Sequence, residues 1–335
     1  MKVGIIGCGL IGGKRAAAVH APHEITGLCD VKKDAAERLA AKIGKPGIFI
    51  TDSYEDLILH SGADIIVVAT IVKTLAPITL FAVQHGKHVI VEKPAARSAA
   101  ELAPVLAAAK EHGVIVKVGF NHRYHPALLK AKEIMDTEAE KVGPVMFIRG
   151  RYGHGGRVGY DREWRANPEL SGGGELIDQG VHLIDLSRWF MGDFETVDGF
   201  AATYFWDMPV DDNGFISLRK ADGRAAWLQV SCTEWKNMFS FEIYCKNAKL
   251  MIDGLGGSYG TERLSRYQML PEMGPPETTI YEYPRGENSW ELEFQEVVRA
   301  IETGGKLSMG DISDAYEALR VVDAIYAKGK EKGRK

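Results

Sequence analysis

The chain has 335 residues, which is long for one hydrophobic core and suits two domains of ordinary size. Its 41 basic and 45 acidic residues give a net charge of −4, so nothing in the charge balance points to nucleic acid or an anionic membrane as a partner. The four cysteines lack CxxC spacing and are expected to be reduced, buried thiols. The N-terminus lacks a signal-peptide pattern, and the longest apolar run, 63–72, is about half of a membrane span, so a cytoplasmic location is expected.

Residues 1–121 alternate short apolar runs with amphipathic stretches. Strands are predicted at 2–7, 24–30, 47–51, 64–69, 87–91 and 114–118, and helices at 10–20, 32–43, 54–60, 77–85 and 98–112. Ser98 is expected to cap the last of these helices, with Glu101 in the capping-box position. The alternation predicts a doubly wound parallel sheet, and hence an N-terminal Rossmann domain over 1–121.

The pattern changes after residue 121. Following a predicted helix at 127–135, alternating segments predict a large, mostly antiparallel sheet, with strands at 145–152, 197–206, 214–220, 225–235, 239–246 and 249–252. Further helices are predicted at 175–191, 290–303 and 312–327, the last one capped by Asp311, and a loop is predicted at 270–276. We therefore expect an α+β domain over 122–335, whose basic tail 328–335 is a solvated end.

A glycine-rich turn directly after the first strand indicates a dinucleotide site. Gly7, Gly9 and Gly12 match G-x-G-x-x-G, with Leu10 and Ile11 between the last two glycines. The first glycine permits the tight turn, the second lets a pyrophosphate approach the backbone, and the third lets the helix pack closely on the strand. The alternative is a tight turn that binds no nucleotide.

An acidic residue ends the second predicted strand. Asp30 lies 18 residues after Gly12, where a carboxylate accepts hydrogen bonds from the adenosine ribose hydroxyls. Its charge would repel a 2′-phosphate and favours NAD over NADP, a preference that Lys32 and Lys33 weaken without reversing it.

Glu92, Lys93 and Pro94 end the fifth predicted strand. The carboxyl ends of strands are where ligands lie in an open parallel sheet, and a lysine there can present its charge to a reacting oxygen. The alternative interpretation is a surface lysine at a strand end.

The predicted helix 175–191 follows three glycines and places Asp178, His182 and Asp185 at i, i+4 and i+7. Histidine suits general acid–base chemistry near neutral pH. Two alternatives are a hydrogen-bonded pair in the core and half of a metal site. Because no further ligand set shows convincing spacing, no metal is predicted.

Together, Gly7, Gly9 and Gly12, Asp30, Glu-Lys-Pro and the Asp178/His182 helix resemble the Gfo/Idh/MocA family, the glucose–fructose oxidoreductase and inositol dehydrogenase group, over nearly the whole chain. The resemblance implies that Lys93, Asp178 and His182 form the catalytic set. It also implies a last helix that packs back on the first domain, and a homodimer or homotetramer formed through the open face of the second sheet. The sequence departs from the family after the fourth strand, where Thr70 is kept but the usual proline and histidine are missing.

The activity implied is NAD(P)-dependent hydride transfer between a secondary hydroxyl of a sugar, cyclitol or nucleotide sugar and nicotinamide. Residues expected to contact the cofactor are Gly7, Gly9, Leu10, Ile11, Gly12, Asp30, Thr70, Glu92 and Lys93. Aromatic, amide and arginine side chains expected to bind substrate are Asn121, Arg123, Tyr152, Arg157, Tyr160, Trp164 and Arg165. The alternatives are an NAD-dependent glycosidase without net redox and a non-catalytic dinucleotide sensor.

Overall fold

The computed structural model describes residues 1–284 and 288–331, which divide into two compact units. The first comprises Met1–Asn121 and Trp290–Tyr316, and the second comprises His122–Ser289 and the chain from Glu317 onward. The expected second domain of 122–335 is therefore interrupted, because helix α10 (Ser289–Glu302) packs its apolar side into the core of the first unit. No helix within the described ranges is both long and apolar enough to cross a membrane.

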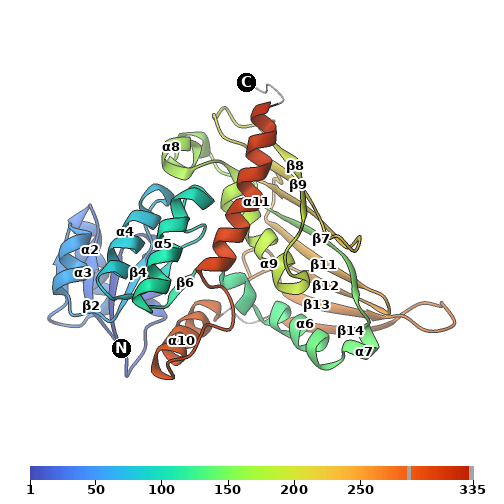
Figure 1. The fold of residues 1–335 in the computed structure, drawn as a ribbon, viewed down its shortest axis with the longest axis horizontal. Helices are drawn as coiled ribbons and strands as arrows, with labels where there is room; N and C mark the ends of the chain where they lie inside the picture. The colour runs from blue at the N-terminus through green and yellow to red at the C-terminus, as the bar shows by residue number, and fades with distance from the viewer. Residues whose placement is uncertain (285–287, 332–335) are drawn as a thin grey trace. The chain divides into compact units, whose positions relative to one another are not determined.

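A six-stranded sheet forms the first unit, and its strands run parallel in the order β3-β2-β1-β4-β5-β6 (Figure 1). The strands are β1 (Lys2–Ile6), β2 (Glu24–Cys29), β3 (Phe49–Thr51), β4 (Ile65–Val68), β5 (His88–Val91) and β6 (Val116–Val118). The chain moves outward from β1 in both directions, which is the doubly wound arrangement predicted from the sequence.

Helices cover both faces of this sheet. One face packs against α1 (Leu10–Ala17), α2 (Lys33–Ile43) and α10, whose Phe294, Val297 and Val298 join the same core cluster as Val3 and Ile5 of β1. The other face packs against α3 (Tyr54–His60), α4 (Val72–Gln84) and α5 (Ala99–His112).

Two details of these helices differ from expectation. Helix α4 begins at Val72 and not at Pro77, so the proline lies inside the helix. Ser98 caps α5, as predicted, by accepting the Glu101 amide at 3.3 Å. The Glu101 carboxylate instead accepts the Arg97 amide at 3.0 Å.

The second unit is built on an eight-stranded sheet, shown in green to orange in Figure 1. Its strands, in the order β14-β13-β12-β11-β7-β10-β9-β8, are antiparallel except for the parallel pair β7–β10. They are β7 (Val145–Gly153), β8 (Thr196–Ala202), β9 (Asn213–Arg219), β10 (Ala225–Ser231), β11 (Met238–Cys245), β12 (Ala248–Asp253), β13 (Glu262–Gln268) and β14 (Glu277–Tyr283).

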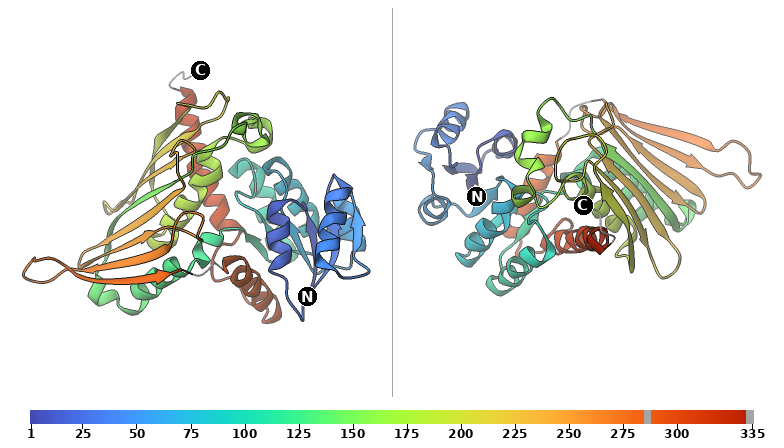
Figure 2. Two further views of the ribbon diagram at one scale, coloured as in Figure 1. Left: turned by 180° about the vertical axis from the view of Figure 1, so that it is seen from behind. Right: turned by 90° about the horizontal axis from the view of Figure 1, so that it is seen from above.

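One face of this sheet is packed and the other is open. Helices α6 (Pro126–Thr137), α7 (Ala139–Val142) and α9 (Val181–Met191) contact one face. Figure 2 shows the opposite face without a covering helix in the described part of this unit. Phe147, Arg149 and Trp227 lie on that open face, and the two aromatic side chains are 41% and 62% exposed.

The remaining segments of this unit are short, apart from the last helix. They are the 3-10 helices η1 (Asn121–Tyr124), η2 (Tyr160–Arg162) and η3 (Trp164–Ala166), helix α8 (Pro168–Ser171), the π-helical turn η4 (Leu176–Gly180) and helix α11 (Ile312–Glu331), within which the two units divide. The single helix predicted at 175–191 is thus a π-helical turn followed by an α-helix.

Neither the edge strand β14 nor its neighbour β13 was predicted from the sequence. Within β13 Leu264 is the one fully buried apolar side chain, and most of β14 is exposed, so neither strand shows a strong apolar signal. The loop predicted at 270–276 connects them. Of the predicted solvated tail, Lys328 lies in α11 and donates to the Val197 carbonyl at 2.7 Å. Residues 332–335 lie outside the described residues.

Candidate functional site

The carboxyl edge of the parallel sheet gathers the residues predicted to bind a dinucleotide. Strands β2, β1, β4 and β5 are consecutive neighbours in the sheet. Asp30 follows β2, Gly7 follows β1, Thr70 is the second residue after β4, and Glu92 and Lys93 follow β5. The predicted residues therefore share one edge, where ligands bind in this fold.

The glycine turn has little room for side chains at its first and third glycines. Gly7 has φ +93°, and a Cβ there would lie 2.4 Å from the Ala69 carbonyl oxygen and 3.1 Å from the Thr70 amide. A Cβ on Gly12 would lie 1.9 Å from the Gly7 carbonyl oxygen. By contrast, a Cβ on Gly9 would meet no atom within 4 Å, so the backbone at the second glycine is open to a ligand.

The start of α1 fits an anionic group. Gly9 is its N-cap, no side chain caps the helix, and its first turn holds no acidic residue. Backbone amides at such a helix end attract phosphate, so the pyrophosphate of a dinucleotide suits this turn. Asp30 is fixed beside it, because its two carboxylate oxygens accept the Cys8 amide at 2.8 Å and the Lys32 amide at 2.9 Å. Each oxygen keeps a lone pair for a ribose hydroxyl.

The segment that lacks the family's proline and histidine forms the start of α4. The Thr74 hydroxyl donates to the Thr70 hydroxyl at 2.9 Å and lies 3.0 Å from the Ile71 carbonyl. These contacts hold Thr70 beside the glycine turn.

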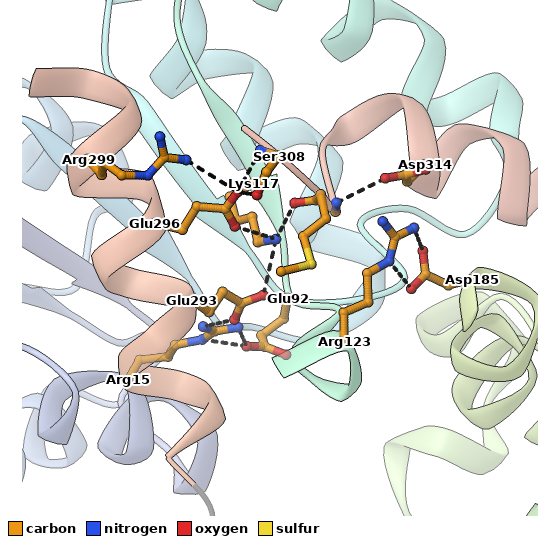
Figure 3. A network of polar contacts seen from close by, with 12 residues as sticks. Arg15, Glu92, Lys117, Arg123, Asp185, Glu293, Glu296, Arg299, Ser308 and Asp314 are labelled. Atoms are coloured by element: carbon orange, nitrogen blue, oxygen red, sulfur yellow. Dashed lines mark hydrogen bonds and ion pairs between the residues drawn. The ribbon is translucent and has the colours of Figure 1, made fainter. Parts of the chain in front are cut away.

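Glu92 belongs to a buried charge network, drawn in Figure 3. Its carboxylate accepts Arg15 Nε at 2.8 Å, and Arg15 also pairs with Glu293 of α10. The guanidinium of Arg15 lies 4.4 Å from the centre of the Trp290 ring. Arg15 therefore holds the Glu92 carboxylate inside the unit. The predicted contact of Glu92 with a cofactor cannot be made through an outward-facing carboxylate. Lys93, the next residue, is half-buried.

The network continues through Lys117, whose side chain is fully buried. Its ammonium lies 3.8 Å from both the Glu293 and the Glu296 carboxylates and donates to the Met309 carbonyl at 2.6 Å. Although burial by itself lowers the pKa of Arg15, the Glu293 and Glu92 carboxylates outweigh it and raise that pKa. The network ties α1, β5, β6 and α10 together within the first unit.

In the second unit, Asp211 fixes the turn that leads into the predicted catalytic helix. Its carboxylate accepts the amides of Gly174 at 3.0 Å and Leu176 at 2.8 Å, and the Tyr326 hydroxyl at 2.7 Å. Burial raises the pKa of Asp211, although these three donors oppose the rise. A Cβ on Gly174 would lie 1.8 Å from the Asp211 carbonyl oxygen, so the turn requires glycine.

His182 lies in the interior, stacked on another histidine. The His182 and His122 ring centres are 3.7 Å apart, with 18° between the ring planes. Tyr152 packs edge-on against both rings, at 6.2 Å and 5.2 Å. Burial raises the pKa of Tyr152 well above its usual range, so its hydroxyl stays protonated. The structure thus brings predicted residues Tyr152 and His182 together and adds His122.

Asp178 is closer to the surface than His182. Its carboxylate lies 3.4 Å from Arg165 Nε, and Arg165 also lies over the Trp164 ring at 4.6 Å. Glu163 lies 3.6 Å from Arg165 and 2.6 Å from Arg157. Asp178 and three predicted substrate residues are therefore connected through charges and ring contacts.

Two predicted substrate residues are engaged elsewhere. Tyr160 is buried and donates its hydroxyl to Glu175 at 2.7 Å. Arg123 is buried and binds both carboxylate oxygens of Asp185, at 2.8 Å and 2.5 Å (Figure 3). This buried bidentate pair joins η1 to α9, and the expected contact of Arg123 with substrate stays a prediction. Asn121, two residues before Arg123, is the last residue of the first unit and is largely buried.

Sequence reasoning passed over Glu175 and His122 as site residues. Glu175 is 1% exposed, accepts Tyr160 and lies 3.5 Å from His154 Nε2. The position of Glu175 in the Gly-Gly-Gly-Glu run was a possible signal, and His122 lies between the predicted residues Asn121 and Arg123. Within the described ranges, no group of three or more His, Cys, Asp or Glu side chains is arranged to hold a metal.

Comparison with known protein families gives two matches along the chain. Residues 1–120 match the family described as "Oxidoreductase family, NAD-binding Rossmann fold", and residues 128–251 match the "GFO/IDH/MocA C-terminal domain". The two matches follow each other in the order of the two sheets described above.

Individual proteins resemble nearly the whole chain. Levoglucosan dehydrogenase of Pseudarthrobacter phenanthrenivorans is 24% identical, over 97% of this chain and 95% of that protein. D-glucoside 3-dehydrogenase of Escherichia coli is 26% identical, over 97% and 94%. Among solved structures, levoglucosan dehydrogenase in complex with NADH and levoglucosan superimposes with a TM-score of 0.87 at 22% identity, covering 99% of this chain and 98% of that one.

Proposed function

Since this chain belongs to the Gfo/Idh/MocA family of oxidoreductases, we propose that it oxidises a secondary hydroxyl of a sugar, a glycoside or a cyclitol with NAD. The observation that carries the proposal is the glycine turn with Asp30 fixed beside it, at the edge of a parallel sheet. Relatives along the full length are named for sugar substrates, and a related structure holds NADH, which supports this substrate class and this cofactor.

The first unit supplies the cofactor site. The amides at the start of α1 bind the pyrophosphate, and Asp30 binds the ribose hydroxyls and disfavours a 2′-phosphate. When bound, NAD accepts the hydride from the substrate carbon. Lys93 contributes a positive charge that stabilises an alkoxide oxygen.

The second unit supplies the base. His182 accepts the hydroxyl proton on its imidazole, a ring that is buried beside Tyr152 and His122. Asp178 and Arg165, which lie 3.4 Å apart, orient the polyol through hydrogen bonds. The assignment of Lys93, Asp178 and His182 to one catalytic set comes from the family resemblance.

The test is a panel of sugars, glycosides, cyclitols and nucleotide sugars, assayed with NAD and NADP by absorbance of the reduced cofactor. We expect turnover with NAD, and a drop of about 10²- to 10⁴-fold in kcat for Lys93→Ala and His182→Ala with NAD affinity kept. The exposed Lys110→Ala and His85→Ala serve as matched controls. Near-normal turnover in both site variants would overturn the assignment. Tight NAD binding without turnover would favour a sensor, and release of free sugar without net reduction would favour a glycosidase.

We also propose that the protein acts as a homodimer or homotetramer in the cytoplasm. The open face of the eight-stranded sheet carries the exposed aromatic side chains of Phe147 and Trp227. Exposed apolar patches of this kind are typical of protein–protein interfaces. Four free, buried cysteines suit a reducing compartment. Trp227→Glu should shift the sedimentation coefficient towards that of a monomer, whereas Val158→Glu, at another exposed apolar side chain, should not.

A further inference from the structure

A short segment of the second unit carries three of the residues predicted to bind substrate. It runs through the 3-10 helices η2 and η3 and holds Tyr160, Trp164 and Arg165. Successive backbone hydrogen bonds of 3.0 to 3.2 Å run along it, from the amides of Arg162, Glu163, Ala166 and Asn167 to the carbonyls of Gly159, Tyr160, Glu163 and Trp164. Because these turns follow one another without a break, a contact that fixes Tyr160 also fixes the place of Arg165.

Two side-chain contacts join this segment to the start of the predicted catalytic helix. The Tyr160 hydroxyl donates to Glu175 Oε1 at 2.7 Å, and Arg165 Nε lies 3.4 Å from the Asp178 carboxylate. Glu175 and Asp178 are three residues apart, and the Asp178 amide donates to the Gly174 carbonyl at 3.0 Å. Both contacts therefore end on one helical turn.

The two contacts differ in burial. Tyr160 is 4% exposed and Glu175 is 1% exposed, whereas the side chains of Arg165 and Asp178 are 35% and 21% exposed. An ion pair that water reaches contributes little by itself, because the solvent screens it. A buried hydrogen bond to a carboxylate is stronger, since breaking it leaves both partners without water. The bond between Tyr160 and Glu175 is therefore the stronger of the two contacts.

Glu175 has a fixed backbone from which to hold the segment. Its own amide donates to the Asp211 carbonyl at 3.0 Å, and the amides of Gly174 and Leu176 on either side donate to the Asp211 carboxylate. Burial and the Glu175 charge raise the pKa of Tyr160, so the phenol stays protonated and remains a donor.

A histidine just after β7 approaches the same carboxylate oxygen. The Gly156 amide donates to His154 Nδ1 at 3.0 Å, so the ring proton lies on Nε2, which is 3.5 Å from Glu175 Oε1. The His154 and Tyr160 rings also pack edge-on, with their centres 5.5 Å apart. Glu175 thus joins both the chain that leaves β7 and the 3-10 segment to the predicted catalytic helix.

We propose that Glu175 is a positioning residue for the substrate, because through Tyr160 it places Arg165 opposite Asp178, where the two side chains bind neighbouring hydroxyls of a polyol. The Glu175 carboxylate is itself too buried to touch a substrate, so it acts through these two side chains. This inference rests on the proposed function, in which Asp178 and Arg165 orient the polyol.

The test compares kcat and KM for the polyol that the wild type turns over fastest in the panel above. Tyr160→Phe removes the hydroxyl and keeps the ring. We expect KM for the polyol to rise about tenfold, with kcat within about threefold and KM for NAD unchanged, because contacts to hydroxyls away from the reacting carbon are lost equally in the ground state and the transition state. Glu175→Gln keeps an acceptor for the phenol, so its KM should stay within about twofold of the wild-type value. Tyr204→Phe, at an exposed tyrosine of the same unit, is the matched control and should leave KM unchanged.

A double-mutant cycle shows whether the effect passes through Arg165. Tyr160→Phe should raise KM no further when Arg165→Met is already present, whereas independent effects would multiply. Should Tyr160→Phe be too unstable to assay, Tyr160→Phe/Glu175→Met removes both partners of the buried bond at little cost in stability and should show the same rise in KM. An unchanged KM in a folded variant that lacks the bond, or effects that multiply with Arg165→Met, would overturn the inference. A wild type that turns over no polyol would instead overturn the proposed function, so the two failures are distinguishable.

Discussion

Replacing Arg15 by methionine removes the central cation of the buried network in the first unit. Methionine keeps an unbranched chain of similar length, so packing against the Trp290 ring is partly kept. The Glu92 and Glu293 carboxylates would lose their shared partner, and both are largely or fully buried. The experiment therefore isolates the charge more than the volume of the side chain.

The expected loss of stability follows from that burial. Removing one partner of a buried ion pair costs about 3–5 kcal/mol, because the remaining charge stays desolvated. Lys117 stays 3.8 Å from Glu293 and compensates part of the loss on that side, whereas Glu92 keeps no comparable partner among the contacts described above. We therefore expect about 3–5 kcal/mol in total for the single variant, and less for the double variant Arg15→Met/Glu92→Gln, which removes one of the stranded charges.

Hydrogen exchange read by mass spectrometry on peptides of β1, β4 and β5 reports the stability of this unit alone. The control is Arg38→Met, whose pairing with Asp34 is exposed and should give no measurable change. Equal hydrogen-exchange protection of β1, β4 and β5 in Arg15→Met and Arg38→Met would refute the expected cost of the stranded carboxylates.

Further predictions concern the turns and the thiols. Gly12→Ala should destabilise the first unit by about 1–3 kcal/mol and abolish NAD binding in calorimetry, because its Cβ would meet the Gly7 carbonyl. The control is Gly13→Ala, which has open space around it and should bind NAD normally. Tyr326→Phe should cost about 1.5–3 kcal/mol at neutral pH in denaturant unfolding. Burial already raises the pKa of Asp211, and loss of the Tyr326 donor raises that pKa further, so the loss of unfolding free energy should shrink on acidification. A loss of unfolding free energy that grows on acidification would contradict this prediction. Burial raises the pKa of Cys8 and Cys29 to about 12 and that of Cys245 to about 11, so native protein at pH 8 should not react with Ellman's reagent while unfolded protein shows all four thiols.

The elements that the sequence predicted well depend on local signals. The apolar run that became β4 needs no distant partner to be recognised as a buried strand. Asp311 caps α11 through hydrogen bonds from the amides of Ser313 and Asp314, at 2.8 Å and 3.2 Å, and all three residues lie within one turn. The glycine turn is likewise contained in six residues, and the structure gives its first and third glycines the steric roles inferred from the spacing.

The features that the sequence did not reveal depend on partners far away in the chain. Arg123 and Asp185 are 62 residues apart, and an arginine after a strand has the same local pattern whether it binds a ligand or a buried carboxylate. His122 and His182 become a pair only through the fold. The amphipathic pattern of α10 shows that it covers a core, but not which of two cores it covers.

That choice of core has a consequence for how the protein is made. The first unit lacks Phe294 and Glu293 until α10 has been synthesised, so a nascent chain ending near residue 121 would leave Arg15 and Lys117 without two of their carboxylate partners. Domains ordinarily complete in order of translation, N-terminal first. Here the nucleotide-binding unit begins first and is completed only after the entire eight-stranded sheet has left the ribosome. A fragment of residues 1–121 should accordingly expose a basic, apolar surface and be retained by chaperones, and it should gain solubility when the segment 290–316 is fused back to it.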